Sequence, residues 1–464
     1  MTMPSRLQQS RARLIQDNEI PPLPEGWDVQ RFRFLFRESK ERNGDTPVGD
    51  MLSVSEYRGV IPKDYEHEEQ RRTDQELQTY RVVRPGQMAV NTMWLNHLGL
   101  GVSEHLGHVS PAYAVYDISP KLDKRFVHHL FRSQYYLKLY LRYLYGIRPN
   151  SFQIKTDDWN SVPVIVPPLD TQKAIADFLD RETGRIDQLI EAKRRFLTVL
   201  DQKWATTVTC AVTNGLQSDV QQRDSDLSFV GKIPLHWTEA RLGHIGRCAN
   251  GINIGGEAFG SGTPFISYGD VYKNPELPTE VTGLVQASPD DRSRYSVKAG
   301  DVFFTRTSET IEEIGFSSAC TRDMPDAVYA GFLIRFRPFK GKLVPQFSKY
   351  LFRNEALRAF FAKEMMIVTR ASLSQGLLQR MPVVLPPLEE QKKIALHLTA
   401  KEKKHSSLLE KTKTSIDSLK EFRVALVTAA VTGQIDVTTW GKYGETDRRL
   451  DRTKEEMPLR EVRA

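Results

Sequence analysis

The chain has 464 residues, of which 40% are hydrophobic and 27% charged, a composition typical of folded globular proteins that excludes wholesale disorder. At roughly 100 to 200 residues per domain, this length predicts about two to four domains. No run approaches the ~20 apolar residues of a membrane span, and residues 1–18 lack a secretory signal's apolar stretch, so we expect a cytoplasmic protein without a membrane partner. The net charge of +7 favours a polyanionic partner only modestly, because it is spread over the whole chain.

The most informative feature of the sequence is an internal repeat, which fixes the architecture before any single motif does. Segments of the first half return in the second half in the same order. The pairs are Leu23–Trp27 with Ile233–Trp237, Arg84–Met88 with Lys298–Val302, Phe126–Arg132 with Phe347–Arg353, and Pro163–Leu169 with Pro382–Leu388. The chain therefore contains two copies of one framework.

Two blocks of mixed character, residues 23–169 and 233–388, make up most of the two copies. Both contain short β-rich runs, such as Gln87–Val90 and Asp301–Phe304, separated by loops with Gly, Pro and Asn. Away from the repeated segments the blocks differ widely, as Leu52–Tyr57 and Thr263–Tyr268 illustrate. We expect one scaffold that presents two different surfaces.

A long segment without proline follows each block, at residues 170–214 and 389–433, with apolar side chains spaced three, four and seven apart. A helix of about 43 residues is roughly 65 Å long, and its single apolar stripe needs a partner helix. Because two equivalent helices occur in one chain, we expect them to pack antiparallel about a pseudo-twofold axis. Two unrelated core helices are the alternative.

The predicted fold class is α+β, with two pseudo-twofold-related globular domains separated by two long antiparallel, coiled-coil-like helices. Three further segments complete the domain prediction. Residues 1–22 form an N-terminal segment, residues 215–232 link the first helix to the second block, and residues 434–464 form a flexible tail that is charged from about Gly441.

This arrangement resembles the specificity (S) subunit of type I restriction-modification systems over almost the whole chain. The openings, the Pro-Pro closers and the helical segments Arg185–Ile190 and Ala430–Asp436 carry the resemblance. It implies two target-recognition domains that each read half of a split double-stranded DNA site, with the helices setting the gap. It also implies a noncatalytic chain that docks two modification (methyltransferase) subunits and is joined by restriction subunits. S-adenosylmethionine, ATP and magnesium would then bind in the partner subunits.

The residues themselves offer no strong motif for catalysis or metal binding. No phosphate-binding G-x-x-x-x-G-K-[ST] loop occurs, and the proline pairs lack the Asn or Asp and the aromatic residue of an amino-methyltransferase loop. Asp180 with Glu191–Lys193 superficially resembles a nuclease signature, but a solvated helix face explains it better. The adjacent His128 and His129 point to different helix faces, and the three cysteines are far apart in sequence.

Candidate DNA contacts are polar residues just ahead of each closing strand. In the first block these are Arg148, Asn150, Ser151, Gln153 and Lys155, and in the second Arg370, Ser372, Ser374 and Gln375. Arginine can pair with guanine, and Asn or Gln with adenine, although a solvated loop is an equal alternative. A second pair of candidates, Asn91–Thr92 and Thr305–Arg306, follows the glycine turns at Gly86 and Gly300.

The preceding segment, residues 121–148, is rich in Lys, Arg and Tyr, which we interpret as partly phosphate-binding and partly core. Two other functions stay open for the whole chain. It could serve a nuclease or methyltransferase that is not of type I, or it could be a coiled-coil scaffold without DNA specificity.

Overall fold

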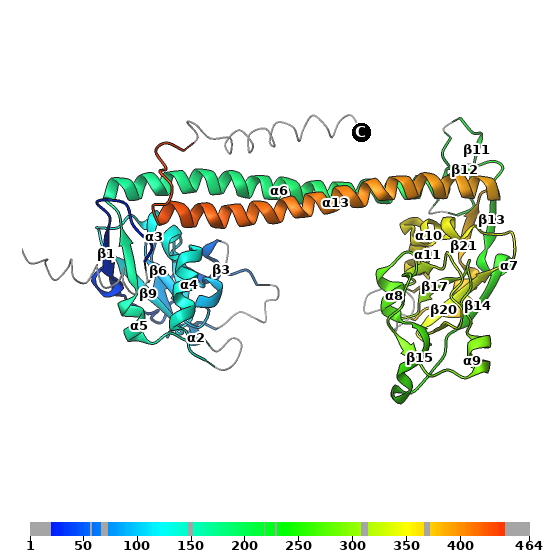
Figure 1. The fold of residues 1–464 in the computed structure, drawn as a ribbon, viewed down its shortest axis with the longest axis horizontal. Coiled ribbons are helices and arrows are strands. Elements are labelled where there is room, and N and C mark those ends of the chain that lie inside the picture. The colour runs from blue at the N-terminus through cyan, green and yellow to red at the C-terminus, as the bar shows by residue number, and fades with distance from the viewer. Residues whose placement is uncertain are drawn as a thin grey trace, which may run out of the picture. The chain divides into compact units, whose positions relative to one another are not determined.

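The computed structural model describes residues 20–55, 58–65, 73–146, 152–217, 219–227, 230–307, 314–365 and 372–440. Its contacts divide the chain into two compact units, Met1–Lys193 with Thr414–Ala464, and Arg194–Lys413. Each unit contains one globular block and part of each long helix (Figure 1). Sheets and helices occur together in both units, so the predicted α+β class is confirmed. None of the described helices has the length and apolarity that a membrane span needs.

The two long helices, α6 (Leu169–Thr213) and α13 (Leu388–Val431), begin and end within two residues of their predicted bounds. Each starts directly after a proline pair, which is compatible with a first helical turn but not with a helix interior. Acidic residues in the first turns, Asp170 in α6 and Glu389 in α13, complement the positive end of the helix dipole.

The helices lie side by side and antiparallel in each unit (Figure 1). In the first unit Arg423 of α13 donates two hydrogen bonds, of 3.0 and 3.2 Å, to the carboxylate of Asp187 on α6. In the second unit His405 of α13 stacks on Trp204 of α6, with ring centroids 5.3 Å apart. Later residues of α6 therefore pair with earlier residues of α13, as the predicted antiparallel packing requires.

The first block is built from a four-stranded sheet of order β2-β9-β6-β7, a second of order β4-β3-β8-β5, and the pair β1-β10. Its strands are β1 (Asp28–Arg31), β2 (Phe36–Glu38), β3 (Asp50–Ser55), β4 (Gly59–Pro62), β5 (Arg81–Val83), β6 (Met88–Asn91), β7 (Leu100–Val102), β8 (Gly107–Val109), β9 (Tyr113–Ile118) and β10 (Pro163–Val166). Its helices are α2 (Asp74–Leu77), α3 (Lys124–Phe131), α4 (Gln134–Tyr143) and α5 (Thr156–Ser161), with short 3-10 turns at Phe32–Phe34 and Leu95–His97.

The second block repeats this plan with a four-stranded sheet of order β14-β20-β17-β18, a three-stranded sheet of order β16-β15-β19, and the pair β13-β21. Its strands are β13 (Thr238–Arg241), β14 (Gly246–Asn250), β15 (Phe259–Ile266), β16 (Leu284–Val285), β17 (Val302–Thr305), β18 (Ser317–Ala319), β19 (Val328–Tyr329), β20 (Leu333–Pro338) and β21 (Pro382–Leu385). Its helices are α7 (Leu242–Ile245), α8 (Tyr268–Lys273), α9 (Pro289–Arg294), α10 (Pro345–Arg353), α11 (Glu355–Met365) and α12 (Gln375–Arg380), with a 3-10 turn at Gly256–Ala258.

Two of the connecting segments are more structured than their sequences predict. The linker 215–232 contains β11 (Gln222–Asp224), which pairs antiparallel with β12 (Lys232–Pro234) at the start of the second block. The tail was predicted to be flexible from residue 434, yet Trp440 packs on Phe178 of α6 with ring centroids 5.5 Å apart. Residues 1–19 and 441–464 lie outside the described residues.

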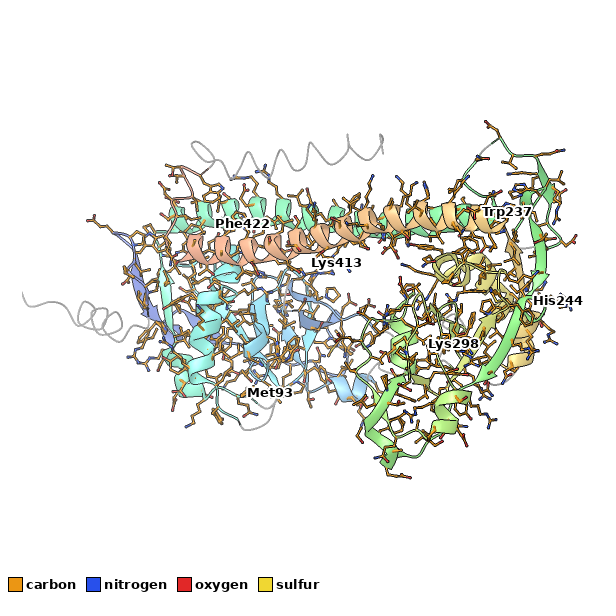
Figure 2. The ribbon with its side chains drawn as sticks, turned by 45° about the vertical axis from the view of Figure 1, so that its right-hand side comes forward. Met93, Trp237, His244, Lys298, Lys413 and Phe422 are labelled. Atoms are coloured by element: carbon orange, nitrogen blue, oxygen red, sulfur yellow. The ribbon has the colours of Figure 1, made fainter. Side chains whose placement is uncertain are left out.

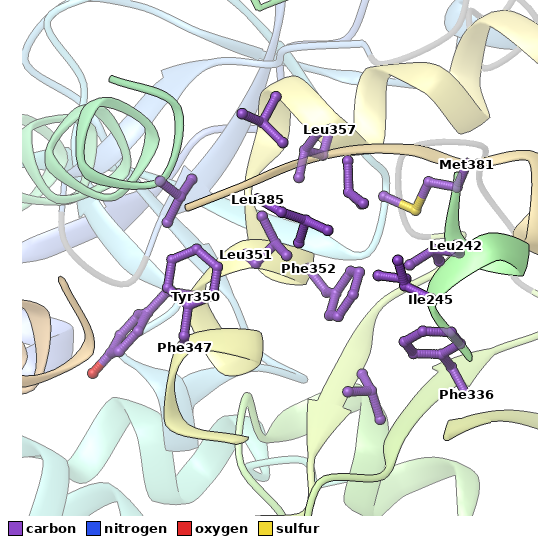
Figure 3. Close-up of a cluster of buried hydrophobic side chains, with 14 of the residues drawn as sticks. Leu242, Ile245, Phe336, Phe347, Tyr350, Leu351, Phe352, Leu357, Met381 and Leu385 are labelled. Atoms are coloured by element: carbon purple, nitrogen blue, oxygen red, sulfur yellow. The ribbon is translucent and has the colours of Figure 1, made fainter. Parts of the chain in front are cut away.

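Aromatic and aliphatic side chains form the core of each block. In the second block α10 places Phe347, Leu351 and Phe352 opposite Phe336 of β20 and Leu385 of β21, and all five are buried (Figure 3). Full burial of each such side chain contributes roughly 1.5–3 kcal/mol. In the first block Phe32 is fully buried and forms the centre of an aromatic cluster.

Each long helix ends beside a glycine that packs on a tryptophan of an opening motif. Gly215 and Gly433 have φ angles of 82° and 72°, the left-handed conformation that favours glycine. A Cβ atom on Gly215 would lie 3.2 Å from the Trp237 ring, and one on Gly433 would lie 3.0 Å from Trp27. Trp237 also donates from Nε1 to Glu390 at the start of α13 over 2.9 Å (Figure 2). The repeated Trp and Gly residues are therefore packing partners.

Equivalent buried glutamines connect each block to the helix that follows it. Gln172 Oε1 accepts from the backbone of Asp123 at 2.8 Å, and its Nε2 donates to the carbonyls of Lys121 and Pro167. In the second unit, Gln391 makes the same three bonds, accepting from Val344 and donating to Lys342 and Pro386. Both side chains are buried. The repeat is thus preserved at the level of single hydrogen bonds.

Replacement of Gln172 by leucine is expected to lower the free energy of unfolding by roughly 2–4 kcal/mol, because it removes a buried amide that bonds to three buried or half-buried backbone groups. Urea unfolding followed by circular dichroism measures this change. The control is Gln202→Leu on the exposed face of the same helix, which should change stability by less than ~0.5 kcal/mol. Equal losses in the two variants would contradict the proposed role of the buried amide.

Charged side chains also connect α3 of the first block to α6. Asp180 accepts from Arg125 at 3.0 Å and lies 2.8 Å from His129 Nε2, while Arg125 also contacts Asp177 at 2.8 Å. The hydrogen bond from His129, with that from Arg125, holds the pKa of Asp180 below its ordinary value. The same place in the second unit is filled by Tyr350, which bonds to Thr399 and Glu402 of α13.

Because the pKa of Asp180 is lowered in the folded protein, its contribution to stability is present above the ordinary aspartate pKa and is lost as the pH falls through the lowered value. Asp180→Asn should therefore be less stable than the natural protein at pH 6, by no more than about 1 kcal/mol because the carboxylate is partly exposed. The difference should shrink as the pH falls below the ordinary aspartate pKa. Urea unfolding at several pH values tests this, and a difference that does not change with pH would point to a steric cause.

Candidate nucleic-acid interface

The predicted contact residues divide into those that the structure describes and those that it does not. Arg148, Asn150, Ser151 and Arg370 lie outside the described residues. The other candidates lie at the end of β6, after α4, at the end of β17 and just before α12.

In the first block, Gln153 and Lys155 are exposed on the segment between α4 and α5. Gln153 forms an antiparallel bridge with Tyr145, with two backbone hydrogen bonds of 3.0 Å. The Nζ atom of Lys155 lies 5.6 Å from the centroid of the Tyr145 ring, which is 49% exposed. The structure therefore brings a cation, an amide and an aromatic ring together on one surface.

Asn91 and Thr92 are half-buried at the end of β6, on a different segment of the first block. The side-chain oxygen of Asn91 accepts from the backbone N–H of Met93 at 3.2 Å, which stabilises the local turn. Met93 itself is exposed (Figure 2). The structure records no bond between this pair and Gln153 or Lys155.

In the second block, three segments meet at Arg306. Its backbone N–H donates to the carbonyl of Phe332, in the turn between β19 and β20, at 3.1 Å. Its own carbonyl accepts from the N–H of Leu373 at 2.7 Å, and the adjacent Thr307 bridges to Ser372. Both predicted segments of this block therefore form one site, here called the Arg306 site: Arg306, Thr307, Ser372 and Phe332.

The side chains of the Arg306 site are available for a ligand. Arg306 is half-buried, and its guanidinium makes no hydrogen bond or ion pair with another described residue. Thr307 and Ser372 are exposed hydroxyls. The carbonyl of Thr307 accepts a hydrogen bond from the Tyr268 hydroxyl at 2.9 Å. This bond connects α8 to the site. An arginine beside two hydroxyls can bind a phosphate or a guanine edge.

Other predicted contacts of the second block are engaged within the protein. Thr305 is fully buried in β17, so its side chain cannot reach a ligand on the surface. Ser374 caps α12 by accepting from the N–H of Leu377 at 3.1 Å. With its amide oriented to satisfy its neighbours, Gln375 donates to the carbonyl of Cys248 at 3.1 Å and accepts from the N–H of Asn250 at 3.2 Å.

The basic and tyrosine-rich segment of the first block serves mainly as core and helix contacts. Tyr136 and Tyr140 are fully buried, and Arg132 donates to the carbonyls of Leu98 and Leu100. Lys138 and Arg142 are exposed on α4, and Lys121 and Lys124 are exposed ahead of and at the start of α3.

The described residues contain no group of three or more His, Cys, Asp or Glu side chains placed to hold a metal ion. His128 packs against Gly59 and Gly101, and burial lowers its pKa to about 3, whereas His129 pairs with Asp180. Burial also raises the pKa of the Cys248 and Cys320 thiols to about 12, which makes them poor nucleophiles.

The repeated framework, the paired helices and the divergent surfaces agree with the comparisons to known proteins. Residues 234–418 match the family model described as the type I restriction modification DNA specificity domain. The match spans the second block and most of α13, and the chain as a whole is similar to type I specificity subunits. The resemblance predicted from the sequence is thereby confirmed.

Two curated relatives carry the same description. The type I restriction enzyme MjaX specificity subunit of Methanocaldococcus jannaschii is 22% identical over 458 residues, which cover 91% of this chain and 96% of that protein. The type I restriction enzyme EcoKI specificity subunit of Escherichia coli K12 is 23% identical over 276 residues, which cover 58% of this chain and 56% of that protein.

Two solved structures share the fold. A chain from a study of complex assembly and conformational transition of the type I R-M system has a TM-score of 0.68 at 16% identity, and the match covers 89% of this chain and all of that one. The HsdS subunit of Thermoanaerobacter tengcongensis has a TM-score of 0.53 at 17% identity, covering 89% of this chain and 99% of that chain.

The Arg306 site yields a direct prediction for DNA binding. Arg306→Ala should weaken DNA binding about tenfold, because it removes a cation that can pair with a phosphate or a guanine. If the contact is to a phosphate, the slope of log K against log salt should also fall by about one. Fluorescence anisotropy of labelled duplexes at several salt concentrations measures both quantities.

The matched control is Arg241→Ala, because Arg241 is an exposed arginine of the same unit at the end of β13. Its removal should change the affinity less than twofold. Equal losses in the two variants would show that only the total charge matters, and would contradict a specific role for the Arg306 site.

Proposed function

We propose that this chain is the noncatalytic DNA-sequence-recognition subunit of a type I restriction-modification complex. The observation that carries the proposal is the combination of a conserved internal framework with divergent exposed side chains. The buried glutamines, Gln172 and Gln391, make the same three bonds in the two blocks. At the surface, by contrast, Thr92 in the first block occupies the position of Arg306 in the second.

Each block is the target-recognition domain for one half of a bipartite double-stranded DNA site. Two surfaces of different chemistry on one scaffold can bind two different base sequences, since hydrogen bonds to base edges determine specificity. In the first block Gln153 and Lys155 support this role, together with the undescribed candidates Arg148, Asn150 and Ser151. In the second block the role is supported by the Arg306 site.

The long helices set the gap between the half-sites and dock two modification (methyltransferase) subunits. Support for docking comes from large apolar side chains that stay exposed on both helices. Leu396 on α13 is 75% exposed and Val199 on α6 is 56% exposed. A helix pair buries its seam, so apolar residues outside the seam are available to a partner protein.

Catalysis belongs to the partners in this proposal. The modification subunits would bind S-adenosylmethionine and methylate adenine, and the restriction subunits would use ATP and magnesium. The relatives' names, which describe specificity subunits, support a noncatalytic role for this chain. The competing function is a helical scaffold without DNA specificity, and it differs in one measurable respect: DNA binding by the assembled complex would be absent or insensitive to sequence.

The decisive experiment is a genome-wide map of methylated adenines in the native host, with and without this gene. We expect one split motif with a fixed gap to lose methylation when the gene is deleted, and to regain it on complementation. A host in which the complex is expressed but methylation does not change would contradict the proposal. Complementation with the Arg306→Ala variant should restore methylation less completely than the natural gene does.

A further inference from the structure

The turn between β19 and β20 contributes the aromatic ring of the Arg306 site, that of Phe332. A hydrogen bond of 3.0 Å from the N–H of Leu333 to the carbonyl of Ala330 closes this turn. Phe332 lies at its tip and is 65% exposed. A single exposed apolar side chain is common on protein surfaces and means little alone. Two further features distinguish Phe332.

The first feature is that the turn is held firmly in place. The segment Gly251–Asn253 packs along it, with hydrogen bonds from Ile252 N–H to the Tyr329 carbonyl (2.9 Å) and from Gly251 N–H to the Leu333 carbonyl (3.3 Å). A Cβ atom on Gly251 would collide with the carbonyl of Ala330. The ring is therefore presented by a fixed backbone, which lowers the conformational entropy that binding would cost.

The second feature is that the first block has the same turn without the ring. There the N–H of Tyr113 donates to the carbonyl of Ser110 at 2.9 Å, and Tyr113 pairs with Asn91 as Leu333 pairs with Thr305. The residue equivalent to Phe332 is Ala112, which is also exposed. One block thus presents a methyl group where the other presents a phenyl ring.

We propose that Phe332 is a wedge that inserts between two base pairs of the half-site read by the second block, while Arg306 holds the adjacent backbone or base edge. The proposal rests on the DNA-recognition function proposed above. Apolar side chains on rigid elements partly unstack DNA in this way, and base–aromatic stacking tolerates many sequences. The Arg306 guanidinium, which pairs with no described residue, and the exposed hydroxyls of Thr307 and Ser372 favour a polyanion over a protein partner.

The wedge makes the two half-sites mechanically different. The second half-site should be unstacked and kinked at one step, whereas the half-site read by the first block stays stacked, because Ala112 has no ring to insert. Specificity at that step would come partly from how easily the step deforms, since pyrimidine–purine steps unstack most readily.

The test uses the full chain assembled with its modification subunits and duplexes that carry 2-aminopurine at successive positions of both half-sites. The natural protein should raise 2-aminopurine fluorescence at one step of one half-site, in addition to any rise at the adenines that the modification subunits extrude for methylation. Phe332→Ala should abolish the rise and weaken binding about tenfold, and Phe332→Trp should retain both. The matched control is Phe339→Ala, which removes another exposed ring of the same unit, after β20, and should change neither readout.

The converse variant, Ala112→Phe, should introduce a fluorescence rise in the other half-site. Unfolding curves that superpose on that of the natural protein exclude misfolding as the cause of any loss. Natural protein that binds its site without a fluorescence rise outside those adenines would overturn the wedge and leave the recognition function standing. Natural protein that binds all duplexes equally would instead overturn the recognition function itself.

Two other outcomes would assign Phe332 a different role. If replacing thymine by deoxyuracil weakens binding of the natural protein but not of Phe332→Ala, and fluorescence never rises, the ring contacts a thymine methyl group and is not a wedge. If Phe332→Ala binds DNA normally but retains less modification subunit on copurification, the ring docks a protein. Each result overturns the proposal.

Discussion

The pairing of the two long helices is the constraint on which the rest of the structure depends. Each helix carries an apolar stripe that cannot be covered by its own block alone, so it needs a partner of similar length. In the first unit Ile186 and Val427 are buried on the paired helices, and in the second unit Val212 and Leu398 are buried in one core with the block. Because both helices contribute to both units, each globular block folds against a surface built from two distant parts of the chain.

Side chains at equivalent positions of the two repeats attach the blocks to this helix pair. The contact is kept in both repeats, but the residue that makes it can differ. Gln172 and Gln391 are identical, whereas the contact made by His129 in the first unit is made by Tyr350 in the second. A similar exchange occurs after the glycine turns. Gln87 donates to Asp117 in the first block, and in the second Arg337 donates both bonds of a bidentate pair to Asp301. Both solutions satisfy a buried polar group, so selection for stability alone permits either.

Much of this architecture could be predicted from the sequence, because helix periodicity, proline pairs and glycine stops are local signals. The bounds of α6 and α13, the closing strands and the α+β class follow from them.

The contact residues of the site were less predictable from the sequence. The sequence placed Thr305 and Arg306 together as contacts, but Thr305 is the last residue of β17, whose four side chains are all buried, whereas Arg306 lies just beyond the strand and is half-buried. Phe332 escaped prediction because its contact with Arg306 joins segments that only the fold brings together. The β11–β12 hairpin was missed because its strands are three residues long.

The ends of these strands explain how one framework can present two surfaces. Along β6 and β17 the side chains of both faces are packed, and the residue just beyond each strand is only half-buried, so the core constrains it less. Thr92 and Arg306 occupy that position in the two blocks, and the tips of the facing turns carry Ala112 and Phe332. Changing these residues costs little folding free energy, since surface substitutions usually lie within ~0.5 kcal/mol of neutral. These residues can change with little loss of stability, and they lie close enough to act together. A new binding specificity can therefore arise at them without any change in the helices or the core.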